Sequence, residues 1–155
     1  MTQPRVLLFD LGGVIVRWTG LEELAGLTGL TRDQVIDVFA GSKILRDYEI
    51  GACDDDTFTA EKLSIFNLDM SAGHFKSEWQ RWVGQTYPGT KDALTALRKD
   101  YTTACLSNTN ALHWEHLPVH IKLDDYFDHS FASQLIGAAK PDAESYRIPL
   151  AAMNV

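Results

Sequence analysis

An α/β fold, with a Rossmann-like parallel sheet and an inserted set of helices, is predicted by three features of the sequence. Residues 5–9 and 102–106 are short runs typical of strands buried on both faces, and residues 129–133 form a third strand pattern. A helical pattern follows each of the later strands, and this alternation favours a parallel sheet with right-handed crossovers. Between the first two strands, residues 18–85 have the periodicity of successive helices.

These patterns predict two structural parts in a chain of 155 residues, a length that accommodates one domain with an insert. Residues 1–17 and 86–155 would form the α/β core, and residues 18–85 would form a helical domain inserted into it. A turn signal at residues 87–89, Tyr-Pro-Gly, returns the chain to the core.

The first strand ends in a chemically informative sequence. Asp10 follows the strand directly, and Gly12 and Gly13 come next. The ligand crevice of an open α/β sheet lies outside the carboxyl ends of its strands, and paired glycines allow a tight turn or close approach to a ligand. Asp10 is therefore placed where a catalytic nucleophile could reach a bound ligand. An ordinary Asp-Gly turn between two strands explains these residues equally well.

The helical domain is predicted from leucine spacing, caps and one aromatic stripe. Thr31 to Gln34 has the form of a capping box, and Asp54 to Asp56 suits helix N-capping because the alternation and distal Glu of a calcium loop are absent. The predicted helices cover residues 21–30, 32–41, 44–50, 57–66 and 71–83. The last of them places Phe75, Trp79, Trp82 and Val83 on one stripe, which we interpret as core packing.

The remaining helices belong to the core. They are expected at residues 90–99, at residues 111–116 before Pro118, and at residues 143–153 with Asp142 as the N-cap. His113, His116 and His120 match no common zinc-site spacing, so we expect exposed helix and loop histidines.

Composition excludes several classes of function. Lys and Arg number 14 against 21 Asp and Glu, a net charge of −7 without a basic stripe, so nucleic acid is not expected as a partner. No run is long enough to span a bilayer, and the first residues lack a signal-peptide pattern. Cys53 and Cys105 have neither metal-ligand nor redox spacing. We expect a cytoplasmic protein in which Cys105 is a core residue.

Three stretches, in order, resemble the motifs of the haloacid dehalogenase-like hydrolase superfamily. They are Phe9–Val14 around Asp10, Cys105–Asn110 around Ser107, and Lys140–Asp142. The resemblance runs from Arg5 to about Met153 and points to the sugar-phosphatase-like branch, whose small helical cap occupies the position of residues 18–85.

The resemblance implies a hydrolase that cleaves a small phosphorylated metabolite. Asp10 would be the nucleophile that forms an aspartyl phosphate. The phosphate would be bound by Lys140, by the hydroxyl of Ser107, by Asn108, and by backbone N–H groups at Leu11 and Gly12. Mg²⁺ would be held by the Asp10 carboxylate and the backbone carbonyl of Gly12. The cap would exclude water and contact the rest of the substrate.

The sequence departs from the family pattern at two places. Most phosphatases of the group carry a second Asp two residues after the nucleophile, as a general acid, and this chain has Gly12 there. The family's fourth motif is an acidic pair that completes the metal site, yet no Asp or Glu follows Glu144. We therefore expect a truncated member that binds Mg²⁺ weakly and whose activity is in doubt.

The missing fourth strand would leave residues 6–9 as an apolar sheet edge, which we expect to pair with a second copy of the chain, to aggregate or to bind a complementary fragment. Two other functions stay open. One is a metal-independent 2-haloacid dehalogenase, which also uses an Asp nucleophile. The other is a catalytically silent binding protein that keeps the pocket.

Overall fold

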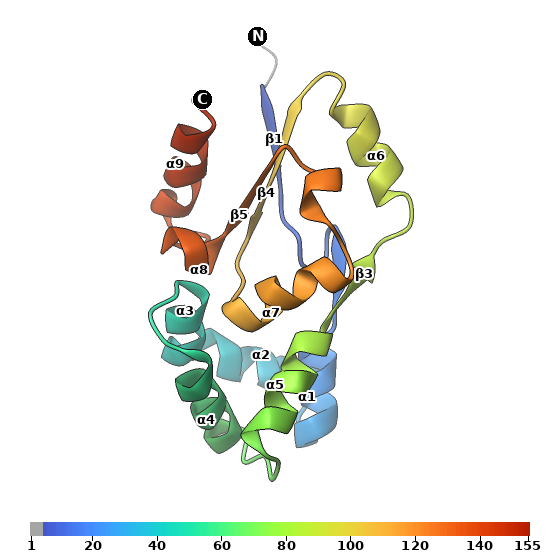
Figure 1. The fold of residues 1–155 in the computed structure, drawn as a ribbon. Helices are drawn as coiled ribbons and strands as arrows, with labels where there is room; N and C mark the ends of the chain where they lie inside the picture. Colours follow the sequence, from blue (N-terminus) through green and yellow to red (C-terminus); the bar gives the residue numbers. More distant parts are fainter. Residues whose placement is uncertain (1–4) are drawn as a thin grey trace.

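The computed structural model describes residues 5–155, and its central feature is a parallel three-stranded sheet. The strands β1 (Val6–Phe9), β4 (Thr102–Ser107) and β5 (His129–Ala132) lie in the order β1-β4-β5. The sheet and the helices around it confirm the predicted α/β class (Figure 1).

The register of the strands brings their carboxyl ends to one edge of the sheet. Phe9 lies beside Cys105, and Ser107 lies beside Ala132. Asp10 and Ser107 therefore leave the sheet at nearly the same level. This edge faces the helices of the insertion, which gather below it in Figure 1.

A second, antiparallel pair of strands connects the sheet region to these helices. Strand β2 (Val16–Trp18) pairs with β3 (Val83–Thr86), with an irregular register between Val16 and Trp18. The sequence patterns do not predict this pair. The periodicity of the insertion extends its last helix to residue 83, whereas the helix ends at Arg81 and Val83 begins a strand.

Five helices lie between β2 and β3, as the periodicity predicted. They are α1 (Gly20–Thr28), α2 (Arg32–Ala40), α3 (Lys43–Glu49), α4 (Asp55–Ile65) and α5 (Ala72–Arg81). The predicted caps are confirmed. The Thr31 hydroxyl accepts from the Gln34 N–H while the Gln34 side chain accepts from the Thr31 N–H, and Asp54 accepts from the Thr57 N–H.

The insertion and the sheet region have separate hydrophobic clusters. Phe58, Phe75, Trp79 and Trp82 are buried among the helices, and the rings of Trp79 and Trp82 lie 4.8 Å apart between centroids. The predicted role of this aromatic stripe in packing is confirmed. The cluster at the sheet includes the fully buried Cys105, as expected, together with residues of β2 and β3. The division at residues 17/18 and 85/86 stays a prediction, because β2 and β3 run across both boundaries.

The helices beside the sheet are α6 (Thr90–Leu97), α7 (Ala111–His116), α8 (Ser133–Ile136) and α9 (Ala143–Ala152), with short 3₁₀ turns at Leu117–Val119 and Leu123–Asp125. In Figure 1, α6 and α9 stand on opposite sides of the sheet. Asp142 occupies the N-cap of α9, but its side chain makes no capping bond. The carboxylate instead pairs with Arg46 of α3.

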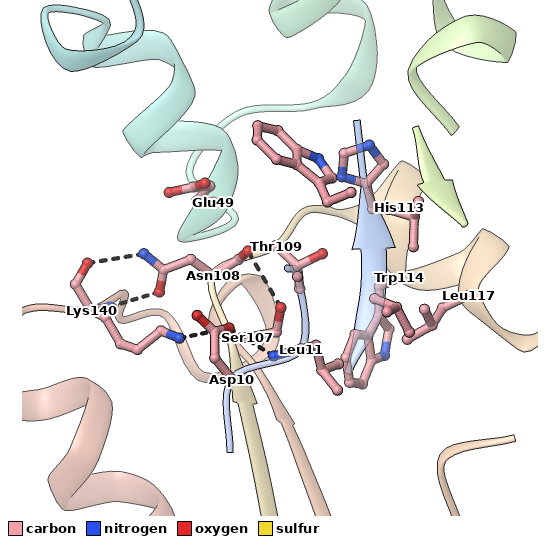
Figure 2. Close-up of a pocket in the computed structure, with 14 residues that line it drawn as sticks. Asp10, Leu11, Glu49, Ser107, Asn108, Thr109, His113, Trp114, Leu117 and Lys140 are labelled. Atoms are coloured by element: carbon pink, nitrogen blue, oxygen red, sulfur yellow. Dashed lines mark hydrogen bonds and ion pairs between the residues drawn. The ribbon is translucent and has the colours of Figure 1, made fainter. Parts of the chain in front are cut away.

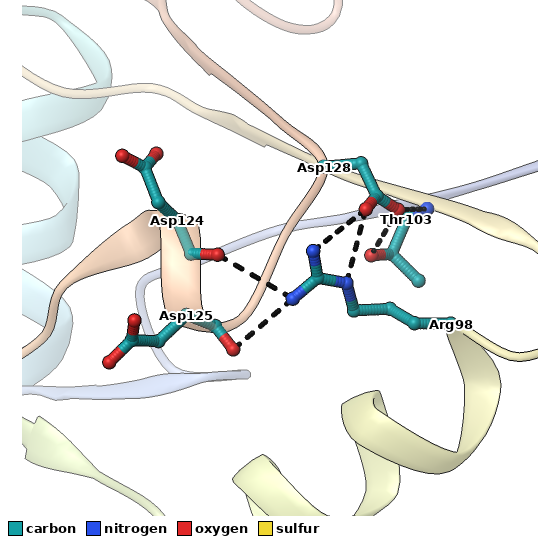
Figure 3. Close-up of polar contacts among 5 residues, drawn as sticks. All are labelled: Arg98, Thr103, Asp124, Asp125 and Asp128. Atoms are coloured by element: carbon teal, nitrogen blue, oxygen red, sulfur yellow. Dashed lines mark hydrogen bonds and ion pairs between the residues drawn. The ribbon is translucent and has the colours of Figure 1, made fainter.

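A cluster of polar contacts lies at the opposite end of the sheet, where β4 and β5 begin (Figure 3). Arg98 donates to the Asp128 carboxylate, with 2.8 Å between Nη2 and Oδ1, and to the carbonyls of Asp124 and Asp125. The second Asp128 oxygen accepts from the Thr103 N–H at 2.8 Å. The Thr103 N–H and the Arg98 guanidinium lower the pKa of Asp128. This cluster ties α6 and β4 to the loop before β5 and lies away from Asp10.

Two further features bear on partners. Within the described sheet, β1 is an edge strand and its four residues are half-buried, in agreement with the expected apolar edge. Among the helices of residues 5–155, none has the length and apolarity that a membrane crossing requires.

Candidate active site

Asp10 and Lys140, which are 130 positions apart in the sequence, meet at the carboxyl edge of the sheet. Lys140 Nζ lies 2.9 Å from Asp10 Oδ1 and donates a second bond, also 2.9 Å long, to the Leu106 carbonyl. The Lys140 side chain is 20% exposed and that of Asp10 46% exposed. The lysine is therefore held from two sides, while the carboxylate opens toward solvent (Figure 2).

The two oxygens of Asp10 differ in their surroundings. Oδ1 accepts from Lys140 and from the Leu11 N–H at 2.7 Å. Among residues 5–155, no hydrogen bond is formed with Oδ2. One oxygen is thus fixed by two donors, and the other is available to a ligand.

The turn after Asp10 is built around one carbonyl. The Leu11 carbonyl accepts from the N–H groups of Val14, Ile15 and Val16, and the Gly13 N–H donates to the Val16 carbonyl. Gly13 has φ +76°, a conformation that favours glycine. The carbonyl of Gly12 accepts none of the backbone bonds of this turn, and Gly12 is exposed at the edge of the cavity.

Ser107 and Asn108 reach the same edge from the end of β4. Ser107 is 6% exposed, and within the described part of the chain its hydroxyl makes a single, long hydrogen bond of 3.4 Å to the Asn108 carbonyl. The Asn108 side chain is engaged with Lys140. Its Oδ1 accepts from the Lys140 N–H at 2.8 Å, and its Nδ2 donates to the Lys140 carbonyl at 2.9 Å. Asn108 therefore fixes the backbone that carries the lysine.

These residues line one cavity of about 260 Å³. Every site residue predicted from the sequence borders it: Asp10, Leu11, Gly12, Ser107, Asn108 and Lys140. The other walls come from β2, β3, α3, α7, the loop between β4 and α7, and the 3₁₀ turn after α7: Val16, Trp18, Glu49, Val83, Thr109, His113, Trp114 and Leu117. The structure thus brings the predicted residues together, and their chemical roles stay predictions.

Glu49 is the charged residue of this cavity that sequence reasoning missed. It is the last residue of α3 and points toward Asn108 from the insertion (Figure 2). Burial raises the pKa of Glu49 to about 7, against the opposing positive charges of Arg46, Lys140 and Lys62. The helical pattern of residues 44–50 does not indicate that the carboxyl of Glu49 borders a cavity at the edge of the sheet.

His113 corrects an expectation, because it is buried rather than exposed. Its Nε2 donates to the Trp79 carbonyl at 2.7 Å, its Nδ1 accepts from the Asn110 side chain at 3.2 Å, and its ring stacks on Trp79. Burial lowers the pKa of His113 to about 4, so the ring is neutral at neutral pH. His113 joins α7 to α5 and forms a wall of the cavity. His116 and His120 are partly exposed.

The oxygen donors that could hold a cation at this edge are the Asp10 carboxylate and the carbonyl of Gly12, an exposed residue. Within residues 5–155, no group of three or more His, Cys, Asp or Glu side chains is arranged to bind a metal ion. Mg²⁺ keeps several waters and commonly binds through one or two carboxylates and a substrate phosphate. The donor set therefore fits a cation held jointly with a phosphate ligand.

Comparison with known proteins indicates the same class of hydrolase as the sequence motifs. The family model of haloacid dehalogenase-like hydrolases matches residues 4–155. A D-ribitol-5-phosphate phosphatase of Bacteroides thetaiotaomicron is 26% identical over 149 residues, covering 90% of this chain and 72% of that protein.

Two solved structures share the fold. A HAD family enzyme of Bacteroides thetaiotaomicron, crystallised with magnesium and inorganic phosphate, superposes with a TM-score of 0.77 at 22% identity, over 97% of this chain and 79% of that one. An L-2-haloacid dehalogenase superposes with a TM-score of 0.66 at 21% identity, over 97% of this chain and 71% of that one.

The fold and the family match define the protein as a hydrolase with an α/β core and inserted helices. The chain belongs to the haloacid dehalogenase-like hydrolases, and its likeness to a sugar-alcohol phosphatase agrees with the sugar-phosphatase-like branch that the motifs indicate.

Proposed function

We propose that the protein hydrolyses a phosphate monoester of a small metabolite through an aspartyl-phosphate intermediate. The observation that carries this proposal is the 2.9 Å contact between Asp10 and Lys140 at the mouth of the cavity, beside Ser107. A carboxylate nucleophile needs a neighbouring positive charge, because an incoming phosphate dianion is otherwise repelled. The cavity volume of about 260 Å³ suits a small ligand.

Each residue would have a distinct part in this reaction. Asp10 attacks phosphorus through a carboxylate oxygen, and Oδ2 is the oxygen that accepts from no donor of residues 5–155. Lys140 neutralises phosphate charge, and Ser107 donates its hydroxyl hydrogen to a phosphate oxygen. Backbone N–H groups of Leu11 and Gly12 supply further donors. Asn108 contributes by holding the Lys140 backbone in place.

Magnesium is the cation that we expect to assist this reaction. Asp10 and the carbonyl of Gly12 would hold it, and it would supply positive charge to the phosphoryl group. The similar Bacteroides enzyme crystallised with magnesium and phosphate supports this assignment. Since the described donor set contains a single carboxylate, Mg²⁺ binding should depend on the phosphate of the substrate.

The substrate class is suggested by the relative that is named as a D-ribitol-5-phosphate phosphatase. The test is release of inorganic phosphate from para-nitrophenyl phosphate and from D-ribitol 5-phosphate, with and without Mg²⁺. We expect turnover of at least the aryl ester by the wild type and none by Asp10→Asn. Phosphate release by Asp10→Asn at the wild-type rate would refute the proposed mechanism.

A 2-haloacid dehalogenase is the second candidate, because that chemistry needs an Asp nucleophile and a halide site but no cluster of metal ligands. The absence of such a cluster within residues 5–155 and the structural likeness to a dehalogenase favour it. Chloride release from 2-chloropropionate, without phosphate release from any ester, would refute the phosphatase assignment and support a dehalogenase. Phosphate binding without turnover of either substrate class, unchanged in Asp10→Asn, would indicate a binding protein.

A further inference from the structure

The proposed reaction lacks one group, a proton donor for the leaving oxygen. When an alkyl phosphate is cleaved, the departing alkoxide is strongly basic and must be protonated as the bond to phosphorus breaks. The position two residues after Asp10 is Gly12, which has no side chain to supply the proton. Another residue that borders the cavity must therefore be found for this role.

Elimination among the residues that line the cavity leaves one candidate. The titratable side chains at its walls are Asp10, Glu49, His113 and Lys140. Asp10 is the nucleophile, and Lys140 is held between Asp10 and the Leu106 carbonyl. His113 is neutral and donates its ring N–H to Trp79. Glu49 is the remaining acid.

The position of Glu49 also agrees with the in-line geometry of phosphoryl transfer. In phosphoryl transfer the attacking and leaving oxygens lie roughly in line, on opposite sides of phosphorus. Asp10 approaches from the end of β1, so the leaving oxygen must depart on the side of the inserted helices. Figure 2 shows Glu49 on that side, at the end of α3.

We propose that Glu49 is the general acid of the first step and the general base of the second, an assignment that rests on the phosphatase function proposed above. In the first step, a bond forms between Asp10 and phosphorus, the bond from phosphorus to the alcohol oxygen breaks, and the Glu49 proton passes to that oxygen. In the second step, water attacks phosphorus where the alcohol left, gives a proton to Glu49 and displaces Asp10. The sum is an alcohol and inorganic phosphate, with both carboxyl groups restored.

The surroundings of Glu49 suit both steps. Burial favours its neutral form and raises its pKa to about 7, while the positive charges that face it favour the anion. These are Arg46 on its own helix, Lys62 on α4, and Lys140 at the sheet edge. Arg46 is paired with Asp142, and Lys62 donates to the hydroxyl of Ser42. A carboxyl with a pKa near the working pH can both give and take a proton.

The test compares Glu49→Gln with the wild type on two kinds of phosphate ester. Glycerol 3-phosphate has an alkoxide leaving group that needs a proton, whereas para-nitrophenyl phosphate has a stable phenolate that does not. In Glu49→Gln we expect turnover of glycerol 3-phosphate and similar alkyl esters to fall about 10²- to 10⁴-fold. The first release of nitrophenolate should remain near the wild-type rate, as a burst followed by slow hydrolysis of the aspartyl phosphate.

Two further readouts separate this role from a structural one. The wild-type rate on the alkyl ester should fall as the pH rises above about 7, and this limb should be missing in Glu49→Gln. Glu49→Asp should regain part of the alkyl-ester activity. Glu61→Gln, which removes an exposed carboxylate from α4, is the matched control and should resemble the wild type.

The outcomes keep the two proposals apart. If the wild type releases phosphate from no ester, the phosphatase function itself is refuted. If the wild type cleaves the aryl ester but no alkyl ester, the function stands and the role of Glu49 is overturned. The same holds if Glu49→Gln slows the first release of nitrophenolate and of the alkyl alcohol equally, or slows neither.

Discussion

The side-chain amide of Asn108 forms both of its hydrogen bonds with the backbone of Lys140, at 2.8 Å to its N–H and 2.9 Å to its carbonyl. The two residues lie on different segments, Asn108 at the end of β4 and Lys140 in the loop before α9. This clamp fixes the backbone from which the lysine side chain reaches Asp10. It makes Asn108 a positioning residue in the proposed site.

Because Asn108 holds the backbone of Lys140, we expect Asn108→Ala to lower activity by misplacing the lysine. Misplacing a charged group by about 1 Å can cost on the order of 10²-fold in rate, so we expect a reduction of up to that size in kcat. The measurement is a double-mutant cycle with Lys140→Met. Because both changes disable the same lysine, the double variant should be no slower than Lys140→Met alone. Additive losses would show that Asn108 acts on the substrate by itself.

Lys140 supplies the positive charge next to the nucleophile, and its replacement should be more severe. Lys140→Met should lower kcat/KM for para-nitrophenyl phosphate by about 10²- to 10³-fold, the usual cost of removing one donor to a developing negative charge. Lys91→Met, at an exposed position on α6, is the matched control. Equal effects of the two variants would mean that the net charge of the protein, rather than the local contact, governs activity.

The sequence predicted the fold and part of the site because both depend on local patterns. Buried strands and capped helices have short-range signals, and parallel strands must end at a common edge, so Asp10 and Ser107 could be expected to meet. Lys140 follows no strand, and only the resemblance to the family motifs placed it with them. The pair β2–β3 was missed because each strand is only three or four residues long. The burial of His113 was missed because it depends on Trp79, which is 34 positions away.

Glu49 was missed for a related reason. Its neighbours in the sequence indicate a helix and nothing about what the end of that helix faces. Its contact with the cavity depends on how the insertion docks on the sheet, which includes the ion pair between Arg46 and Asp142. Such long-range placement of single side chains has no periodic signal.

Magnesium and phosphate should bind interdependently. The cation would be held by the Asp10 carboxylate and the Gly12 carbonyl, so most of the remaining ligands must come from water and phosphate. Isothermal titration calorimetry should show weak Mg²⁺ binding alone and at least about tenfold tighter binding with saturating phosphate, within the usual range of coupling between two sites. By thermodynamic reciprocity, Mg²⁺ should tighten phosphate binding by the same factor. Independent binding would contradict the joint site.

The open edge of β1 should promote association. Because one side of this half-buried strand has no strand partner in the described sheet, its backbone groups can pair with another chain. Light scattering after size-exclusion chromatography should show a mass that rises with protein concentration. Hydrogen exchange of β1 should slow in parallel. A constant monomer mass with unchanged exchange would contradict this prediction.

Lys62 provides a test of stability that is independent of catalysis. It is fully buried in the insertion, where its Nζ donates to the neutral hydroxyl of Ser42 at 2.7 Å and lies 5.0 Å from the ring centre of Phe39. Burial lowers the pKa of Lys62 from 10.5 to about 8. Between these two pH values the unfolded chain binds more protons at this lysine than the folded chain, so the free energy of unfolding should rise with pH.

The comparison that isolates Lys62 is urea unfolding of the wild type and Lys62→Met across this pH range. From about pH 8 to pH 10, the wild type should gain about 2 kcal/mol relative to Lys62→Met, since each unit of pH is worth about 1.4 kcal/mol per proton. Other lysines and tyrosines titrate in both proteins and cancel in the difference. A difference that does not change with pH would mean that Lys62 has its ordinary pKa in the folded protein, despite its complete burial.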